Sequence, residues 1–201
     1  MVLVSIIGGS GAGKTSVTNA IFTHFKSCAS ILSMDDYYKN LEPGTDPREF
    51  NFDSPKAFDF DLFESHLKCI KENRSINVPV YSMVTYRREE GICRRFDPKP
   101  LVIVEGLLVM FKREMRDLFD FSIYIDAPAD ERLIRRIERD TRERGRSLES
   151  IITQYRKFVS PSFESFIEPQ KYFCAIVLPD GAANTTGLNV ITNAIENMLK
   201  K

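Results

Sequence analysis

The stretch Ile6-Ile7-Gly8-Gly9-Ser10-Gly11-Ala12-Gly13-Lys14-Thr15 decides the fold of this chain. An apolar run at 2–7 leads into it, and apolar residues at Val17, Ile21 and Phe25 follow it with helical spacing. The order is strand, glycine-rich loop, helix, which is the P-loop pattern in the context that confirms it. Glycine lets backbone N–H groups turn inward at a helix N-terminus, so we expect the loop to bind a phosphate chain.

Two side chains at the end of this loop carry specific expectations. Lys14 would reach the β- and γ-phosphates of a bound nucleotide, and the Thr15 hydroxyl would ligate Mg²⁺. The alternative for such a stretch is a flexible Gly/Ser turn, but the flanking strand and helix favour the P-loop. The residues expected to hold the nucleotide are Gly8, Gly9, Ser10, Gly11, Ala12, Gly13, Lys14, Thr15 and Ser16.

Length, charge and cysteine spacing limit the class of protein. A chain of 201 residues that is 43% hydrophobic can bury one sizeable core, so we expect a single domain over residues 1–201. The net charge is zero, which argues against nucleic acid and anionic membranes as partners. The four cysteines are dispersed and indicate neither zinc nor disulfides. Without a leader or a membrane-spanning run, we expect a cytoplasmic protein.

Short apolar strands alternate with helical segments along the chain. This alternation predicts an α/β fold with a P-loop NTPase-type parallel sheet of about five strands and helices on both faces. The expected strands are 2–7, 30–34, 101–106, 121–125 and 174–178. The expected helices are 13–26, one from a Ser54 N-cap and Pro55 to Ile70, one from Pro128 to a break at Gly145, 148–167 and 186–199.

The segment 76–96 differs from this alternation. Two runs rich in Val, Tyr and Thr flank Glu89-Glu90-Gly91, so we expect a β-hairpin that turns there, protrudes from the main layer and covers the substrate site. Tyr81 and Tyr86 lie in this hairpin. They are candidates for stacking on or bonding to a base, although strand tyrosines often only pack across a sheet.

Two acidic residues follow predicted strands at the edge where the P-loop lies. Glu105 ends its strand as a Walker B acid does, holding Mg²⁺ directly or through water. Asp35 follows the second strand, which we expect beside the P-loop strand, and is placed to accept a proton from an attacking hydroxyl. The structural alternatives are a polar residue that merely ends a strand for Glu105 and an Asx turn for Asp35. The Asn-Lys-x-Asp and Asp-x-x-Gly signatures of GTPases are absent, which weakens a switch function.

An arginine-rich segment follows the fourth predicted strand. Acidic residues alternate with the arginines, so a solvated helix face with i,i+4 pairs is one interpretation. The other is a lid, residues 128–147, that closes over the phosphates and stabilises the transferring group. The arginines are at positions 132, 135, 136, 139, 142, 144 and 146.

These residues resemble the uridine-cytidine kinase family over nearly the whole chain, from Val2 to about Leu199. The P-loop alone is generic, whereas Asn-Phe-Asp at 51–53 and Glu-Arg-Gly-Arg at 143–146 are much more specific. The matching segments are 8–15, 35–39, 51–59, 78–81, 104–108, 132–140, 143–146 and 154–159.

The resemblance implies Mg²⁺- and ATP-dependent phosphorylation of the 5′-hydroxyl of uridine or cytidine in pyrimidine salvage, by a homo-oligomer that is commonly a tetramer. It implies Asp35 as the base and Arg139 as a lid contact to the phosphates, with Asp53 and Arg146 on the ribose hydroxyls. The residues implied around ribose and base are Tyr38, Asp53, Arg136, Arg146 and Gln154.

The sequence departs from the family in two places. Tyr86 stands where the family commonly has histidine, and Ser82-Met83 replaces Asp-Phe, so we hypothesise a shift toward cytidine. Pro179-Asp180-Gly181-Ala182 replaces Pro-Arg-Gly-Gly on the adenine side, which leaves ATP or GTP open as donor. The competing functions are a kinase of the same fold for another hydroxyl, such as a ribulose phosphate or pantothenate, and a non-catalytic nucleotide-binding module.

Overall fold

A parallel sheet of five strands forms the centre of the protein, and the computed structural model describes all residues 1–201. Every neighbouring pair in this sheet runs parallel, as the sequence predicts. All six residues of β1 are buried, because a central parallel strand is covered on both faces. The strands are β1 (Val2–Ile7), β2 (Ala29–Ser33), β5 (Leu101–Gly106), β6 (Phe121–Asp126) and β7 (Ile176–Pro179).

The lateral order of the strands is β2-β5-β1-β6-β7. The expectation that the second strand lies beside the P-loop strand was therefore wrong, because β5 is hydrogen-bonded to both β1 and β2 and separates them. The carboxyl ends of β1, β5 and β2 still meet at one edge, and the segments containing Gly8, Glu105 and Asp35 lie there.

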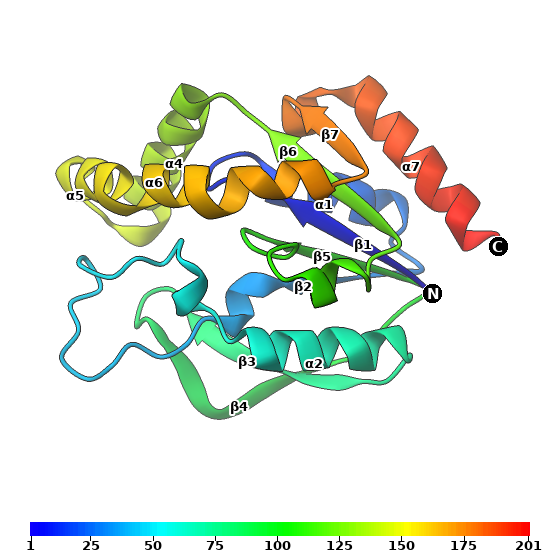
Figure 1. Cartoon of the computed structure of the whole chain (residues 1–201), viewed down its shortest axis with the longest axis horizontal. Helices are drawn as coiled ribbons and strands as arrows, with labels where there is room; N and C mark the ends of the chain where they lie inside the picture. The colour runs from blue at the N-terminus through cyan, green and yellow to red at the C-terminus, as the bar shows by residue number, and fades with distance from the viewer.

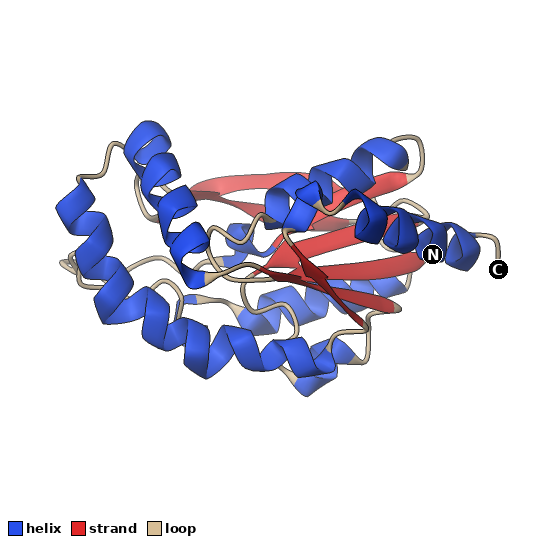
Figure 2. Ribbon diagram, turned by 90° about the horizontal axis from the view of Figure 1, so that it is seen from above, coloured by secondary structure: helices blue, strands red, loops and turns tan.

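Helices cover both faces of the sheet (Figures 1 and 2). Alternate residues of β1 serve different cores: Leu3 packs in the core that includes α2, and Val4 in the core that includes α1 and α7. The segments α4 and α5 lie at one end of the molecule and both termini at the other. The helices are α1 (Lys14–His24), α2 (Phe60–Lys71), α3 (Arg113–Arg116), α4 (Ala129–Arg144), α5 (Leu148–Gln154), α6 (Ser160–Ser162) and α7 (Thr185–Leu199).

The segment after Ser54 is not one helix, contrary to the prediction. The Ser54 hydroxyl accepts from the N–H of Lys56 and caps only the short 3₁₀ turn Pro55–Ala57. Phe58 is extended and pairs with Tyr38 in an isolated bridge. The helix α2 then begins at Phe60, because the Asp59 carboxylate accepts the N–H of Leu62 at 3.2 Å.

The hairpin β3 (Ile76–Ser82) and β4 (Arg87–Phe96) forms its own two-stranded sheet beside α2 (Figure 1). It turns at residues 83–86, where Tyr86 has a left-handed φ of 56°, and not at 89–91 as predicted. The residues 89–92 instead form an irregular bulge within β4, with Gly91 at φ 71°. The prediction was wrong because an acidic Glu-Glu-Gly sequence suits a bulge as well as a turn.

The chain from Leu148 to Phe173 stays helical, but its turns change type. Wide π turns occupy Tyr155–Val159 and Phe163–Ile167 on either side of α6, and a 3₁₀ segment, Glu168–Phe173, ends the path. Pro161 in α6 has no N–H to donate, which explains a departure from regular α-helix there. Gly145, with φ 61°, ends α4 as predicted and lets the chain reverse into this path.

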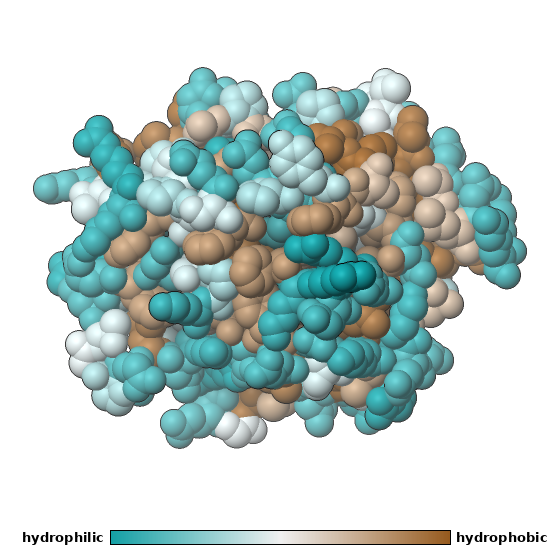
Figure 3. Space-filling view, viewed as in Figure 1, coloured by the Kyte–Doolittle hydropathy of each residue, from teal (hydrophilic) through white to brown (hydrophobic).

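The surface of the face in Figure 1 is mixed. Polar residues dominate its periphery, and apolar residues reach the surface in its middle and over the β7 side (Figure 3). No helix combines the length and the apolar character that crossing a bilayer requires.

Candidate active site

The P-loop connects β1 to the first turn of α1. Gly11 has φ 80°, and a Cβ there would lie 2.2 Å from the carbonyl oxygen of Arg132 on α4, so only glycine fits. Gly13, with φ 94°, forms the N-cap of α1. The ammonium of Lys14 donates to the carbonyl oxygens of Gly8 and Gly9 at 3.0 and 3.3 Å. The loop is thus packed against α4, and the partly buried ammonium of Lys14 lies over it.

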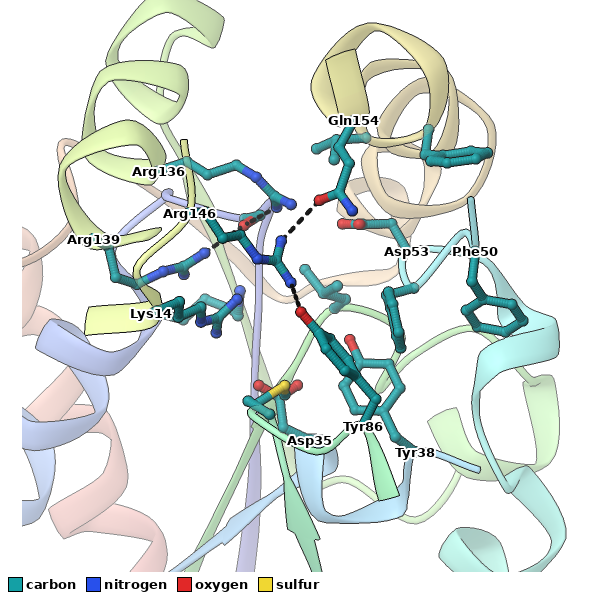
Figure 4. A pocket seen from close by; sticks show the side chains of 17 residues that line it. Lys14, Asp35, Tyr38, Phe50, Asp53, Tyr86, Arg136, Arg139, Arg146 and Gln154 are labelled. Carbon is teal, nitrogen blue, oxygen red and sulfur yellow. Dashed lines mark hydrogen bonds between the residues drawn. The ribbon is translucent and has the colours of Figure 1, made fainter. Parts of the chain in front are cut away.

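Next to the P-loop lies a pocket formed by segments that are far apart in the sequence (Figure 4). Nine of the residues singled out from the sequence line it together. These are Lys14, Asp35, Tyr38, Asp53, Tyr86, Arg136, Arg139, Arg146 and Gln154, with Ser10 of the predicted nucleotide loop as a tenth. Phe52, Met83 and Arg144, which the sequence analysis named only as parts of motifs, line the pocket as well. Sequence reasoning had not singled out the remaining lining residues, Phe50, Leu107, Phe158 and Val159.

Lys14 and Asp35 enter this pocket from different strand ends. Lys14 follows β1, and Asp35 belongs to the 3₁₀ turn Met34–Tyr37 that follows β2. Figure 4 shows both side chains directed into the same space. Burial lowers the pKa of Lys14, while the negative charges of Glu105 and Asp35 oppose this change.

Glu105 lies behind the pocket at the end of β5. Its carboxylate accepts a hydrogen bond of 2.7 Å from the Ser33 hydroxyl. Burial and the nearby Asp35 raise the pKa of Glu105, and Lys14 and the Ser33 bond oppose them. No group of three or more His, Cys, Asp or Glu side chains is arranged to hold a metal. The half-buried carboxylate of Glu105 and the Thr15 hydroxyl nevertheless fit Mg²⁺, which takes few protein ligands and keeps waters and phosphate oxygens.

Four arginines of the pocket converge on one carboxylate, that of Asp140 on α4. Its side chain is 0% exposed, and its oxygens lie 2.8 to 3.7 Å from guanidinium nitrogens of Arg136, Arg139, Arg144 and Arg146. Burial alone would raise the pKa of Asp140, but the arginines outweigh it and lower that pKa. The interpretation of this segment as a solvated face is therefore wrong for these arginines, although Arg135 does pair with Glu131 on the outside.

The arginine segment also contacts the P-loop. Arg136 and Arg139 donate to the Ser10 hydroxyl at 2.9 and 3.4 Å. Arg132 stacks 3.6 Å from the ring of Phe163 and does not line the pocket. The lid region thus lies directly on the loop that is expected to hold phosphates.

Within the same cluster, Arg146 connects three elements. It donates to Gln154 on α5 at 2.8 Å and to the Tyr86 hydroxyl at the hairpin turn at 2.7 Å (Figure 4). Asp53 lies nearby, 4% exposed, and its Oδ1 has no hydrogen-bond partner. Burial raises the pKa of Asp53, while Arg136 and Lys14 oppose that shift.

Aromatic rings form the remaining wall. Phe52 lies 5.3 Å from Tyr86 and 5.8 Å from Tyr38, measured between ring centroids. Tyr81, expected to contact substrate, does not line the pocket and packs 5.2 Å behind Tyr38. Burial raises the pKa of Tyr81 to about 12. The run Phe50-Asn51-Phe52 beside Asp53 was the signal available in the sequence for this wall.

The site thus combines a P-loop and a carboxylate in one pocket lined by arginines and aromatic rings. The family model described as "Phosphoribulokinase / Uridine kinase family" matches residues 3–187. The chain belongs to the phosphoribulokinase/uridine kinase family. It is therefore a kinase, an enzyme that transfers a phosphoryl group.

One curated relative supports this membership, and one solved structure supports the fold. The uridine kinase of Staphylococcus aureus (strain JH9) is 40% identical over 202 residues, which cover 99% of this chain and 97% of the relative. The phosphoribulokinase from Rhodobacter spheroides superposes with a TM-score of 0.63 at 16% identity, over 89% of this chain and 69% of that one. The second likeness concerns the fold alone.

Proposed function

We propose that this kinase phosphorylates the 5′-hydroxyl of a pyrimidine ribonucleoside, uridine or cytidine, with ATP as donor and Mg²⁺ as cofactor. The observation that carries the proposal is that Lys14 of the P-loop and Asp35 line one pocket with Asp53, Arg146 and Gln154. The 40% identity to a uridine kinase over nearly the full length supports the substrate class.

Asp35 is the proposed base. Its carboxylate accepts the proton of the 5′-hydroxyl as the oxygen attacks the γ-phosphorus, and the bond from that phosphorus to the β,γ-bridging oxygen breaks. The products are a nucleoside monophosphate and a nucleoside diphosphate. The P-loop, residues 8–16, holds the donor phosphates through its N–H groups and the Lys14 ammonium. Arg139, bound to Ser10 of that loop, stabilises the charge on the transferring group.

Thr15 and Glu105 are the proposed residues for holding Mg²⁺, which neutralises charge on the β- and γ-phosphates when bound. Glu105 is the only carboxylate among the last residues of β5, and Thr15 follows the P-loop lysine.

The sugar and the base occupy the side of the pocket away from the P-loop. Asp53 accepts from ribose hydroxyls and Arg146 donates to them, which suits a cis-diol. The unpartnered Oδ1 of Asp53 supports this role, because a buried carboxylate oxygen without a partner is costly unless a ligand completes it. Phe52, Tyr38 and Tyr86 supply flat apolar faces for the pyrimidine, with Arg136 and Gln154 nearby.

We also propose that residues 1–201 act as one kinase domain, with the hairpin 76–96 closing the base side and residues 128–147 the phosphate side. The proposed setting is pyrimidine salvage in the cytoplasm, and the resemblance favours a tetramer, which light scattering would measure.

A panel of acceptors with Mg²⁺ and either ATP or GTP tests the function, with products identified by mass. We expect uridine or cytidine monophosphate, and no product from ribulose 5-phosphate or pantothenate. Product from one of the latter alone contradicts the substrate class, and nucleotide binding without any product contradicts the reaction.

A further inference from the structure

One hydroxyl outside the pocket is hydrogen-bonded both to the carboxylate of Glu105 and to the backbone of Asp35, two residues to which the proposed reaction assigns different roles. The Ser33 Oγ donates to Glu105 Oε1 at 2.7 Å and accepts the backbone N–H of Asp35 at 3.3 Å. Ser33 itself does not line the pocket. Its side chain is therefore not placed to contact the nucleoside.

The strand pairing explains why this hydroxyl reaches both groups. Ser33 is the last residue of β2, and Glu105 is its partner in the parallel register of β2 with β5. Side chains of registered partners on the same face lie next to each other. Ser33 is also the N-cap of the 3₁₀ turn Met34–Tyr37, which carries Asp35. Ser33 thus contacts both Glu105 at the end of β5 and the start of the 3₁₀ turn that follows β2.

The bond to Ser33 is the only hydrogen bond that the Glu105 carboxylate makes within the chain. It fixes one oxygen of that carboxylate, so the other remains available to a metal ion or its water. Hydrogen-bond partners of metal-binding carboxylates orient them, and their loss commonly reduces metal affinity or activity 10- to 100-fold.

We propose that Ser33 is a positioning residue, which orients Glu105 toward Mg²⁺ and at the same time fixes the turn that presents Asp35. The part of this inference that concerns Asp35 rests on the proposed function. The part that concerns Glu105 and Mg²⁺ can be tested by nucleotide binding alone. The competing explanation is that Ser33 only caps a short turn, in which case its loss would lower thermal stability slightly and leave Mg²⁺ coupling unchanged.

The first experiment is calorimetric titration of the whole chain with ADP, with and without Mg²⁺. We expect Mg²⁺ to tighten ADP binding to the native chain. In Ser33→Ala this Mg²⁺-dependent gain should fall about tenfold, while the Kd measured without metal stays unchanged. Ser33→Cys, which keeps the size but donates weakly, should behave like Ser33→Ala, and Ser33→Thr, which keeps the hydroxyl, should recover most of the gain.

A double-variant test identifies Glu105 as the group through which Ser33 acts. In a Glu105→Gln background, Ser33→Ala should produce little further loss of Mg²⁺ coupling, because the oriented carboxylate is already gone. Ser30→Ala is the matched control: Ser30 lies on the same strand, and its hydroxyl accepts only the N–H of Lys99 at 3.4 Å. We expect Ser30→Ala to bind ADP and Mg²⁺ as the native chain does.

Turnover supplies the second readout. Ser33→Ala should lower kcat about tenfold with little change in the KM for nucleoside, because Ser33 does not contact that substrate. Full Mg²⁺ coupling and full kcat in both Ser33→Ala and Ser33→Cys would overturn the proposal, as would a native chain whose ADP binding ignores Mg²⁺. If the native chain phosphorylates no nucleoside, the proposed function fails, and the ADP titrations still decide the role of Ser33 toward Glu105.

Discussion

Arg146 donates a 2.7 Å hydrogen bond to the hydroxyl of Tyr86, and this bond joins the end of the lid region to the turn of the hairpin. The two residues come from segments 60 positions apart, and both line the pocket. The bond fixes the position of the phenol oxygen. A fixed group in a base-binding wall discriminates between bases more strongly than an adaptable one.

Tyr86→His should therefore change base selectivity. Imidazole can present either an N–H or a lone pair according to its tautomer, so it can serve both the uracil carbonyl and the cytosine amino group. The Arg146 bond occupies one acceptor site of the phenol oxygen, so the cytidine hypothesis requires its second lone pair to accept from the cytosine amino group. On that hypothesis the native chain favours cytidine in kcat/KM, and the variant brings the cytidine-to-uridine ratio closer to one. Parallel kinetics with both nucleosides measure the ratio. Equal kcat/KM values for the native chain would contradict the cytidine hypothesis.

Asp35→Asn should separate binding from chemistry. An amide cannot accept the hydroxyl proton, so we expect kcat to fall at least about 100-fold while ADP binding stays nearly intact. Asp36→Asn is the matched control, since Asp36 pairs with Arg94 on the hairpin and does not line the pocket. Undiminished turnover in Asp35→Asn would remove Asp35 from its proposed role.

Asp53→Asn should raise stability and lower activity. Burial raises the pKa of Asp53 in the folded state, so the folded chain binds the proton more tightly than the unfolded chain. The resulting penalty is absent below the unfolded pKa near 3.8 and is complete above the raised folded pKa. We expect a higher Tm than the native chain at pH 7, a difference that shrinks on acidification, and a kcat/KM at least about tenfold lower. A lower Tm at pH 7 would mean that Asp53 is already well satisfied without substrate.

Asp140→Asn should disrupt the arginine cluster. The arginines lower the pKa of Asp140, so its contribution to stability is present above the unfolded pKa near 3.8 and is lost as the pH falls through the lower folded pKa. Removing one partner of a buried charge cluster costs about 3 kcal/mol, and we expect that loss at pH 7 in denaturant titrations. The KM values for both substrates should rise, because four pocket arginines lose their common partner.

Glu138→Gln provides the comparison for Asp140→Asn. Glu138 lies on the same helix and is exposed, so we expect its loss to change stability by less than about 0.5 kcal/mol. Equal losses of unfolding free energy in the two variants would show that Asp140, buried among four arginines, contributes no more to stability than an exposed acid on the same helix.

The features that sequence predicted well are those in which local chemistry determines local structure. The P-loop, the buried strands and the break at Gly145 each follow from residue types within a few positions. The residues brought together from distant strand ends, such as Lys14 and Asp35, followed from the rule that ligands bind at the carboxyl ends of parallel strands.

The features that sequence missed depend on contacts between distant segments. The residue pattern of a single buried strand does not indicate its neighbours, so the position of β5 between β1 and β2 was not predictable from any one strand. In the sequence, Asp140 is one of several acidic residues in a charged helix. It is buried because α4 packs on the P-loop. The hairpin turns at residues 83–86, where Tyr86 adopts a left-handed conformation that its residue type does not favour, so the local sequence did not indicate a turn there.

The strand order sets the separation between the strand end that carries the P-loop and the strand end that carries Asp35. Because one strand separates β1 from β2, the strand ends that carry the P-loop and the proposed base are two lateral steps of about 4.8 Å apart, or about 10 Å. The intervening strand carries Glu105 between these two strand ends, where Mg²⁺ held by the proposed carboxylate ligand would neutralise charge on the donor phosphates.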